Sequence, residues 1–437
     1  MHHAEAEAAA HGGPLGELVK HLHDFLMEQR RLSDGVSAAW RRVWLLTDLM
    51  LTHVRGMILD DVVSQGFETI NDIDWRAWMK KHGAREETLN SALVRGIYEY
   101  VFAFEEGRED RPSLEAGTAI HGALRLVFSY KKAIFWTMQG AMGEVVFTPL
   151  YQLLKDRGVR FEFFQQVRSL ELSEDKSTID GIAIGVQAEL KSADHDYDPF
   201  FQVCGIDAWP SHPFYEQLVQ GEDLRERQID LESPFSGWDD VGRRELRRGE
   251  DFDDVVLGIS RGALEEICGE LIEHRQGWRR MIAKVKTVQT QSLQLWLKPT
   301  RRELGWHAPE TILTAYQPPW STWADLSFLG SKEDWAPGMV GSLAYFCGVM
   351  PTMTPDGDAR DFVYQAEAKV RDNARRWLDR HVEHIWPDAT LPGSSGLDYS
   401  LLIDPENREG VARLDAQFVR ANVNPSDAYV LSVPGSS

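Results

Sequence analysis

The sequence lacks the short motifs that mark the commonest phosphate-binding and zinc-dependent sites. No GxGxxG turn, P-loop or HExxH motif occurs in its 437 residues. A complete glycine-rich cradle for a dinucleotide, a nucleoside triphosphate loop and a zinc-protease helix are therefore not predicted. The many carboxylates are scattered along the chain, so their spacing nominates no acid–base pair.

Cysteine is scarce, and its pattern excludes a disulfide framework. Cys204, Cys268 and Cys347 lie far apart and form no CxxC pair. This usage predicts buried, reduced thiols in a cytoplasmic protein. The N-terminal residues lack a basic stretch followed by an apolar one, so no signal peptide is expected.

Long apolar runs are also missing. The longest, at 43–59, carries Asp48, His53 and Arg55. It is too short and too polar to cross a bilayer. We expect an amphipathic helix of the core, with a position on a membrane surface as the alternative.

Basic residues are outnumbered by acidic ones, and this excludes one class of partner. The chain has 47 Lys and Arg against 68 Asp and Glu, a formal charge of −21 and a pI near 5.1. Nucleic-acid binding requires clustered basic residues, so it is not expected. Hydrophobic residues are plentiful, at 43% with 15 Trp and 19 Phe. That composition predicts a folded, enzyme-like protein, and the length predicts two or three lobes.

The first 136 residues are predicted to be almost entirely helical. Asp72 or Asp74 would cap a helix that Gly83 ends. Apolar residues spaced three and four apart predict further helices at 15–32, 88–104 and 117–136.

The pattern changes at Gly140, where a helix and the first strand of an α/β region are predicted. The helix would begin between Glu144 and Thr148, which precedes a proline. Gly158 would end it as a left-handed cap. Residues 159–164 are apolar and predict a buried strand directly after the helix.

Later segments predict more of the same sheet. Residues 167–190 predict an antiparallel hairpin with Asp180 and Gly181 as its turn. Residues 253–260 (DDVVLGIS) predict a second buried strand that leads into a helix. Continuous apolar strands are typical of a parallel, doubly wound sheet covered on both faces, whose ligands lie at the carboxyl ends of the strands.

The rest of the chain is predicted to be a flap followed by a second α/β region. Residues 191–249 mix Pro, Gly and Asp with aromatic residues and predict a folded insertion. Three further elements are predicted: a helix around 278–281, a strand at 286–297 and a long amphipathic helix at 358–387.

Two groups of side chains have more than one interpretation. His381 and His384 lie one helical turn apart, but no third metal ligand has suitable spacing, so a solvated helix face is favoured over a metal site. Four aromatic residues would either line a substrate channel or pack in the core: Trp320, Trp323, Tyr345 and Phe346.

The order of glycine turn, helix, strand, meander and second strand resembles a flavoprotein superfamily. The segments QGAMGEVVFTPLYQLLKDRGVRFEFFQQVRSLEL and FDDVVLGISRGAL resemble the middle of the FAD-dependent amine oxidases and phytoene desaturases. The resemblance covers about 140–297 directly. It implies FAD as cofactor and an α/β fold with a large helical portion: an incomplete FAD/NAD(P)-binding-type sheet plus a substrate domain of helices and a mixed sheet.

The resemblance also implies which residues contact FAD. A GGMG-like turn opens the helix at Gly140, Met142 and Gly143, and Ser260 follows the second strand. Val167 matches a valine whose backbone contacts the adenine. A backbone N–H and C=O suit the edge of that ring, and an apolar side chain packs against its face.

Four regions follow from the resemblance. Residues 1–136 would be the helical part of the substrate domain, and 137–275 a segment of the flavin-binding lobe with its insertion at 191–249. Residues 276–395 would supply the sheet and long helix of the substrate domain. Residues 396–437 would return toward the flavin lobe.

Two departures from the family leave the activity of this chain open. The family's opening βαβ unit and its closing flavin segment have no counterpart here. We therefore expect a fragment, or one part of a split enzyme whose dinucleotide-binding unit comes from a second polypeptide. The alternative is a cofactor-free scaffold that binds a partner through the flap at 191–249.

One position on the strand predicted at 286–297 distinguishes amine oxidation from the other reactions of the family. Amine-oxidising members of the family carry a lysine on the strand that corresponds to 286–297, where this chain offers Gln291 or Ser292. The resemblance therefore implies desaturation or dehydrogenation of a small, hydrophobic substrate in preference to amine oxidation. Gln291 would either face that site or be an ordinary residue of a half-buried sheet.

Overall fold

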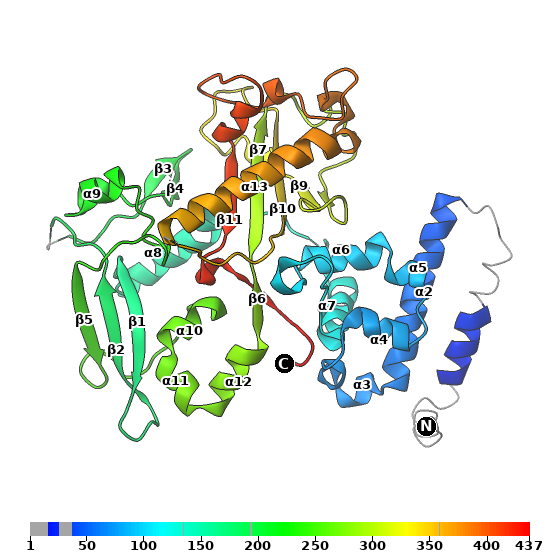
Figure 1. The fold of residues 1–437 in the computed structure, drawn as a ribbon, viewed down its shortest axis with the longest axis horizontal. Helices are drawn as coiled ribbons and strands as arrows, with labels where there is room; N and C mark the ends of the chain where they lie inside the picture. Colours follow the sequence, from blue (N-terminus) through cyan, green and yellow to red (C-terminus); the bar gives the residue numbers. More distant parts are fainter. Residues whose placement is uncertain (1–15, 26–36, 134, 193–194, 358) are drawn as a thin grey trace.

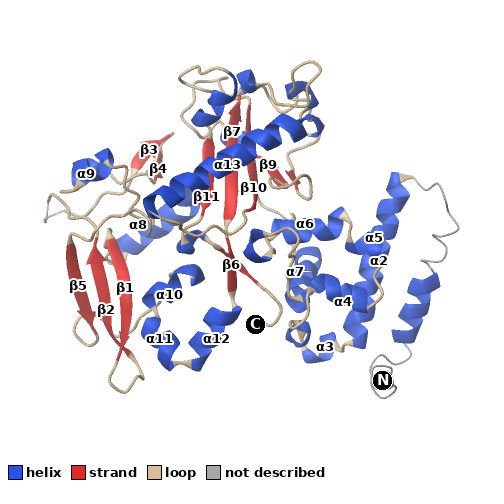
Figure 2. Cartoon of the chain, in the orientation of Figure 1, coloured by secondary structure: helices blue, strands red, loops and turns tan. Residues whose placement is uncertain are grey.

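The computed structural model describes residues 16–25, 37–133, 135–192, 195–357 and 359–437. Figure 1 shows three regions: a helical unit, a central sheet with a long helix across it, and a smaller sheet with short helices beside it. The central sheet has five strands and the smaller one three. Figure 2 shows that the strands are confined to the second and third regions. The N-terminal residues from which a signal peptide was judged absent lie largely outside the described residues.

The helical unit confirms most of the prediction for the first third of the chain, but the helix predicted at 117–136 ends at Phe128, and residues 26–32 of the helix predicted at 15–32 lie outside the described residues. Residues 16–25 are helical, and Asp74 caps a helix by accepting hydrogen bonds from the backbone N–H groups of Arg76 and Ala77. Gly83 follows that helix with φ +93°, in the left-handed region that glycine tolerates. The α-helices are α2 (Ala38–Leu59), α3 (Val62–Gln65), α4 (Trp75–Lys81), α5 (Glu86–Leu89), α6 (Ala92–Tyr100) and α7 (Ala116–Phe128).

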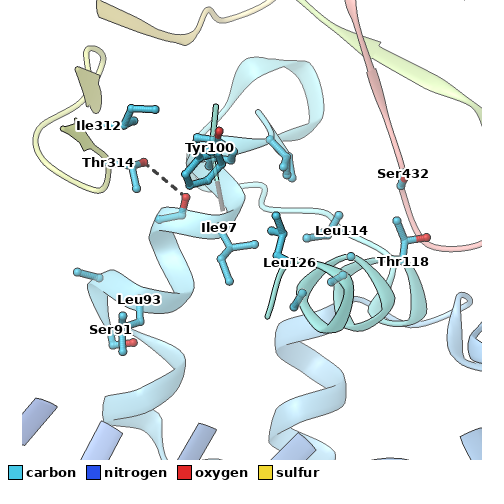
Figure 3. Close-up of a pocket in the computed structure, with 18 of the residues that line it drawn as sticks. Ser91, Leu93, Ile97, Tyr100, Leu114, Thr118, Leu126, Ile312, Thr314 and Ser432 are labelled. Atoms are coloured by element: carbon cyan, nitrogen blue, oxygen red, sulfur yellow. Dashed lines mark hydrogen bonds between the residues drawn. The ribbon is translucent and has the colours of Figure 1, made fainter. Parts of the chain in front are cut away.

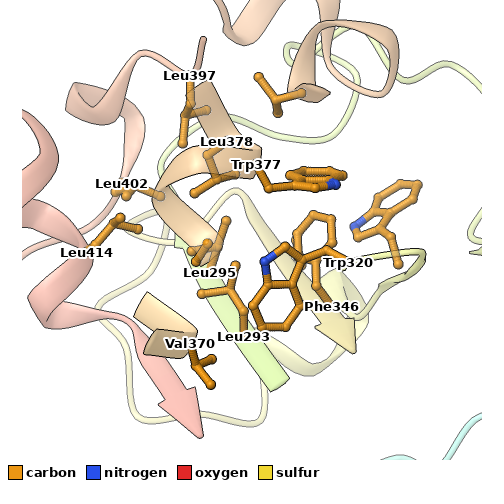
Figure 4. Packing of buried hydrophobic residues seen from close by; sticks show 14 of the residues in the cluster. Leu293, Leu295, Trp320, Phe346, Val370, Trp377, Leu378, Leu397, Leu402 and Leu414 are labelled. Atoms are coloured by element: carbon orange, nitrogen blue, oxygen red, sulfur yellow. The ribbon is translucent and has the colours of Figure 1, made fainter. Parts of the chain in front are cut away.

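The central sheet is antiparallel throughout. Its strand order is β11 (Phe418–Asn422), β7 (Thr290–Leu297), β10 (Ser342–Val349), β9 (Thr322–Asp325) and β8 (Ile312–Leu313). The helix α13 (Ala359–His381) covers one face. Leu293 and Leu295 alternate toward that helix and meet Val370 and Trp377 in a fully buried core (Figure 4).

The smaller sheet has the order β1 (Gln165–Leu172), β2 (Ile179–Val186) and β5 (Gly242–Arg247). The predicted hairpin is confirmed, but its turn lies between β1 and β2 at 173–178, and Asp180 and Gly181 are inside β2. The surrounding elements are α8 (Thr148–Asp156), the flap hairpin β3 (Phe201–Val203) and β4 (Ile206–Ala208), α9 (Gly221–Glu226), α10 (Leu264–Ile267), α11 (Gly269–His274) and α12 (Gln276–Lys284).

The helix α8 begins and ends where the sequence predicts. A π-helical turn at Gly143–Phe147 contains Glu144 and leads into the helix at Thr148, with proline next. Gly158 follows with φ +86°. The predicted N-terminal range and the glycine cap are both confirmed.

The parallel, doubly wound sheet is the main prediction that was wrong. All the strand pairs described between named strands are antiparallel. Residues 159–163 and 254–259 belong to no helix or strand, and Ile259 lies in a bend. Leu257 and Ile259 pack beside β1, whereas Val256 is 96% exposed. A run of apolar residues forms a two-sided buried strand only where neighbouring strands flank it, and neither segment has such neighbours here.

The C-terminal residues connect the regions. β12 (Tyr429–Leu431) pairs with β6 (Lys286–Val288), and Leu431 and Val433 enter the core of the helical unit. Among the described residues, no helix has the length and apolar character that crossing a membrane requires.

Candidate functional site

An apolar cavity of about 930 Å³ lies between the helical unit and the C-terminal strand. This volume is within the range of about 300–1,000 Å³ that ligand pockets occupy. Figure 3 shows α6 and α7 on two sides, Ile312 and Thr314 near one end, and Ser432 near the other. Apolar lining residues include Leu45, Leu46, Leu93, Ile97, Leu114, Leu126, Phe135, Ile312, Val430 and Leu431.

Local sequence signals place α6 at this wall. Ser91 caps the helix by accepting a hydrogen bond from the backbone N–H of Val94. Gly96 lets the helix approach Thr314, because a Cβ at this position would lie 3.1 Å from the Thr314 methyl group. The Thr314 hydroxyl donates to the carbonyl oxygen of Gly96 at 3.5 Å (Figure 3). These contacts hold α6 against the loop that follows β8.

The hydroxyl groups in the wall are largely satisfied by the protein itself. Ser91 donates to the carbonyl of Thr88 at 2.7 Å, and Thr118 donates to Glu115 at 2.9 Å. Arg42, at the edge, is the charged member of the lining. The interior therefore suits an apolar ligand, with a cation at its entrance.

Tyrosine and cysteine side chains lie beside one end of the cavity. Burial raises the pKa of Tyr100, and the nearby Cys347 and Tyr429 raise it further. Burial and Cys347 raise the pKa of Tyr345 to about 12, and burial raises that of the Cys347 thiol to about 11. These groups are therefore neutral at physiological pH, and none of them is a base or a thiolate nucleophile there.

The five residues that the resemblance assigned to FAD fall into two groups. Val167 lies inside β1 opposite Ile184 and packs in the cluster that contains Leu257 and Ile259. Ser260 follows that segment, and its hydroxyl donates to the carbonyl of Ser426 at 2.7 Å. These two residues thus flank the same small core.

The other group is the glycine turn. Gly140 and Met142 precede the π-helical turn, and a Cβ on Gly143 would lie 3.1 Å from the Trp209 ring of the flap. Gly140 is five residues beyond Phe135, which lines the cavity, and Ser426 is three residues before Tyr429, which also lines it. Three residues span at most about 11 Å. The glycine turn therefore lies in a segment that leads to the cavity, and Ser260 contacts another such segment through Ser426.

Gln291 and Ser292 stand where amine-oxidising members of the resembled superfamily carry a lysine. Gln291 is fully buried; its amide donates to the carbonyl of Val349 at 2.8 Å, and its oxygen accepts from Asn373 of α13 at 3.0 Å. It is therefore an ordinary sheet residue on the α13 face. Ser292 points to the opposite face, where it bonds with Tyr345.

Of the two interpretations of the four aromatic residues, packing in the core is confirmed for three. Trp320, Trp323 and Phe346 belong to the core under α13 and are at most 2% exposed. Phe346 contacts the ring of Trp377 with centroids 5.1 Å apart. Tyr345 alone faces the other side of the sheet. Successive side chains of β10 point to opposite faces of the sheet, so Tyr345 and Phe346 lie on different faces. The sequence alone does not reveal which of the two faces lies toward the cavity.

The histidine pair does not form a metal site in the described part of the chain. His381 ends α13 and His384 lies in the turn after it. No group of three or more His, Cys, Asp or Glu side chains suitable for a metal ion occurs among the described residues. The interpretation as a surface-facing pair is retained.

Sequence reasoning overlooked one motif. Gly258, Ser260 and Gly262 have the GxSxG spacing of a hydrolase nucleophile elbow. Ser260 has φ −63° and ψ 152°, an unstrained extended conformation, and its hydroxyl is bound to Ser426. The segment before it is not a strand. The geometry is therefore not that of a strained, exposed nucleophile.

The cavity itself was also missed, because its wall combines residues from five distant parts of the chain. The three-and-four spacing in α6 and α7 predicts apolar faces, but it does not predict that two such faces stand apart instead of packing together. The signal available in the sequence was the surplus of apolar and small residues in α7, such as Gly122 and Ala123, which line the cavity.

The sequence matches no protein-family model and no curated protein. The structure is similar to the crystal structure of an oxidoreductase from Methanosarcina mazei, with 11% sequence identity and a TM-score of 0.40. The match covers 81% of this chain and 56% of that protein. This chain therefore spans little more than half the length of that oxidoreductase.

Proposed function

We propose that this chain forms the substrate-binding side of an FAD-dependent oxidoreductase that desaturates or dehydrogenates a small, hydrophobic molecule. The observation that carries the proposal is the apolar cavity of about 930 Å³. The glycine turn that resembles a flavin-contacting part of a known superfamily begins five residues after Phe135 of its wall, and Ser260 bonds to Ser426, three residues before Tyr429 of the wall. A hydrophobic cavity beside a flavin is the arrangement such a reaction requires.

The side chains of the cavity suit the removal of hydride from an apolar substrate. Leu93, Ile97 and Leu126 would hold the substrate and exclude water. Tyr100 is protonated at neutral pH because burial and its neighbours raise its pKa. Its hydroxyl would orient a polar end of the substrate by hydrogen bonding. The absence of a lysine at positions 291 and 292 favours this chemistry over amine oxidation.

The described residues fit only part of an FAD molecule. Val167, Ser260 and the turn from Gly140 to Gly143 would form one wall for the adenine side. The chain offers no glycine-rich cradle for the pyrophosphate. When bound, FAD would supply the hydride acceptor of the reaction.

We propose that a βαβ unit from a second polypeptide completes the cofactor site. Residues 159–163 and 254–259 belong to no described helix or strand, and no backbone hydrogen bond is described from the N–H groups of 160–163 or 254–259. Backbone N–H groups without a partner can pair with an added strand. Each segment adjoins a helix, α8 before the first and α10 after the second, as strands of an α/β layer do.

FAD titration with the chain alone tests the cofactor assignment. We expect weak, saturable quenching of flavin fluorescence, because one wall of the site is present, and loss of the flavin on desalting. Met142→Glu should weaken binding at least about tenfold, since a carboxylate would stand beside an anionic cofactor. Met142 is 51% exposed, so the fold should tolerate the change.

Met339→Glu is the matched control. Met339 is also a half-exposed methionine, and it lies in the loop before β10. Its variant should bind FAD as the unchanged chain does. Absence of saturable binding, or equal weakening by both substitutions, would remove the cofactor assignment.

The flap supports a second candidate function, that of a cofactor-free scaffold. The hairpin of β3 and β4 exposes Phe201 and Ile206, and the flap has its own core around Leu218 and Leu224. A folded, exposed apolar hairpin suits a protein contact. A chain that binds no FAD, yet loses a protein partner on Phe201→Ser and Ile206→Ser substitution, would favour this alternative.

A further inference from the structure

The mouth of the cavity lies in a surface of exposed apolar side chains. Seven of the lining residues are each 41–51% exposed: Leu46, Leu93, Leu126, Phe135, Ile312, Tyr429 and Val430. A buried pocket would hide these side chains, and a polar substrate would gain nothing from them. Both the exposed surface around the mouth and the lining of the cavity are therefore apolar.

The end of α7 and the loop after it extend this surface. We call residues 127–133 and 135–136 the rim segment. Phe128 is 78% exposed and Trp136 is 72% exposed, and Val127 and Tyr130 are also exposed. Phe135 joins the segment to the cavity through a ring contact with Tyr100, with centroids 5.6 Å apart. Aromatic rings with a polar edge are typical of the boundary between lipid and water.

The rim segment and the helix α7 before it have a net charge opposite to that of the molecule. Residues 116–143 contain Arg125, Lys131 and Lys132 and no Asp or Glu, in a chain with 68 acidic residues. Lys131 and Lys132 lie within the rim segment and are exposed. An anionic surface would be attracted here and repelled by most of the rest of the chain.

The helix α2 continues the surface on the other side of the mouth. Trp40, Val43, Leu46 and Met50 are exposed and spaced three or four residues apart, so they lie along one helix face. Arg42 and Leu46 of this helix line the same cavity as Phe135 of the rim segment. The exposed face of α2 and the rim segment thus flank one opening.

We propose that this surface docks on an anionic lipid bilayer and that the cavity takes up an apolar ligand directly from the bilayer. Basic residues beside exposed aromatic and aliphatic side chains are the features of a protein that lies on such a membrane. The described helices do not cross a bilayer, so the attachment is to its surface. The proposal goes beyond the assignment of an oxidoreductase and does not depend on flavin.

The open mouth distinguishes a bilayer from a protein partner. A protein packed against Leu93, Leu126 and Phe135 would close the entrance to the cavity. A bilayer would cover the same apolar side chains and leave its own hydrocarbon continuous with the cavity interior. Apolar molecules concentrate in hydrocarbon and are scarce in water, so the second arrangement both covers the surface and supplies the ligand.

Sedimentation with lipid vesicles tests the proposal on the full chain. We expect binding to vesicles of phosphatidylcholine with 30% phosphatidylserine, little binding to phosphatidylcholine alone, and weaker binding at high salt. Lys131→Glu with Lys132→Glu should lower partitioning by about 30-fold or more, since each basic residue near an anionic surface strengthens binding by about fivefold. Phe128→Ser with Trp136→Ser should lower it independently of salt.

Arg279→Glu with Arg280→Glu is the matched control. These exposed arginines lie on α12, outside the cavity lining, and the substitution changes the net charge by the same amount. It should leave vesicle binding within about twofold of the unchanged chain, because attraction to the surface acts within about one Debye length. Thermal unfolding of every variant identifies any loss of fold.

Three outcomes would overturn the proposal. The first is absence of binding to anionic vesicles at low salt. The second is equal loss of binding in the rim variant and the α12 control. The third is a dimer of the chain that Phe128→Ser with Trp136→Ser dissociates while vesicles are not bound, which would make the surface a protein interface. Failure of FAD binding alone would leave the membrane surface intact.

Discussion

At the scale of single residues, Asp60 is a partly buried carboxylate that holds one end of the helical unit together. It accepts hydrogen bonds from the indole N–H of Trp78 and the imidazole of His82, each at 2.8 Å, and from Lys81 at 2.9 Å. Burial alone would raise the pKa of Asp60, but the bonds from His82, Lys81 and Trp78 lower it below its ordinary value of 3.8. The charged form is therefore the one that the fold stabilises.

Asp60→Asn should lower the free energy of unfolding at pH 7 by about 1–3 kcal/mol, because charge-assisted bonds to three partners are lost. A carboxylate whose pKa is lower in the folded than in the unfolded state stabilises above its unfolded pKa. That contribution disappears as the pH falls through the folded pKa. Urea unfolding should show the advantage of the unchanged chain shrinking below about pH 4. A constant difference between pH 7 and pH 2 would contradict this role, and Asp110→Asn, in an exposed pair, is the control.

The cysteines should differ in reactivity by their surroundings. Cys204 is exposed, Cys268 is buried and Cys347 is partly buried. Burial raises the thiol pKa of Cys268, and raises that of Cys347 to about 11. Since the thiolate is the reactive form, mass spectrometry after brief alkylation at pH 8 should find Cys204 modified first. The variant Cys204→Ser should lose the fast phase; rapid modification of Cys347 would mean that the sheet face is open to solvent.

At the scale of elements, the backbone amides of residues 160–163 and 255–259 should exchange hydrogen at different rates from those of the strands beside them. Amides at 160–163 and 255–259 lack described backbone partners, whereas Leu170 lies inside the β1–β2 ladder. Hydrogen exchange should therefore be fast in both segments and slow at Leu170. A second polypeptide that adds strands should slow exchange in both segments together. Slow exchange in the isolated chain would show that they are already paired.

Elements were predicted from the sequence where the signal was local. Asp74 and Gly83 bound a helix as expected, and Gly158 ended another, because caps depend on a few neighbouring residues. The run at 254–259 was misread because its apolar residues indicate burial only if other strands flank it. The Trp320 and Trp323 rings were assigned no side of the sheet for the same reason: facing partners far along the chain decide it.

The candidate site was predicted only in part. A hydrophobic binding function was expected, but the cavity was sought among the aromatic residues of the central sheet and lies between α6 and α7. The flavin-contacting residues remain predictions. The glycine turn follows Phe135 of the cavity wall, and Ser260 bonds to Ser426 in the segment that contains Tyr429. Neither link is made by a short motif.

At the scale of the whole molecule, the C-terminal residues hold the helical unit to the sheets. Glu115 is 1% exposed and accepts hydrogen bonds from the backbone N–H groups of Ser436 and Ser437 at 3.0 Å, while its own N–H donates to Ser432. Asn71 donates to the hydroxyl of Ser437 at 2.9 Å. The two regions are therefore joined by a network around one buried carboxylate.

Glu115→Ala should lower the free energy of unfolding by about 1–3 kcal/mol, because it removes the buried acceptor of three hydrogen bonds from Ser436 and Ser437. It should also make the C-terminal residues sensitive to protease under native conditions. Glu106→Ala, in an exposed ion pair with Arg111, should change stability by less than about 1 kcal/mol. Unchanged proteolysis in the Glu115 variant would show that the contacts of Leu431 and Val433 suffice to hold the tail.

The strand β12 is both a wall of the cavity, through Tyr429 and Val430, and the strap by which Leu431 joins the helical core. Filling the cavity and holding the two halves of the molecule together are therefore linked equilibria. A ligand that contacts β12 stabilises the joined state by the difference between its binding free energies for the joined and the separated states. Separation of β12 from the helical unit must therefore weaken ligand binding by the same amount. Protein emptied of its ligand should come apart first at this strap, and added ligand should raise the temperature at which the helical unit separates.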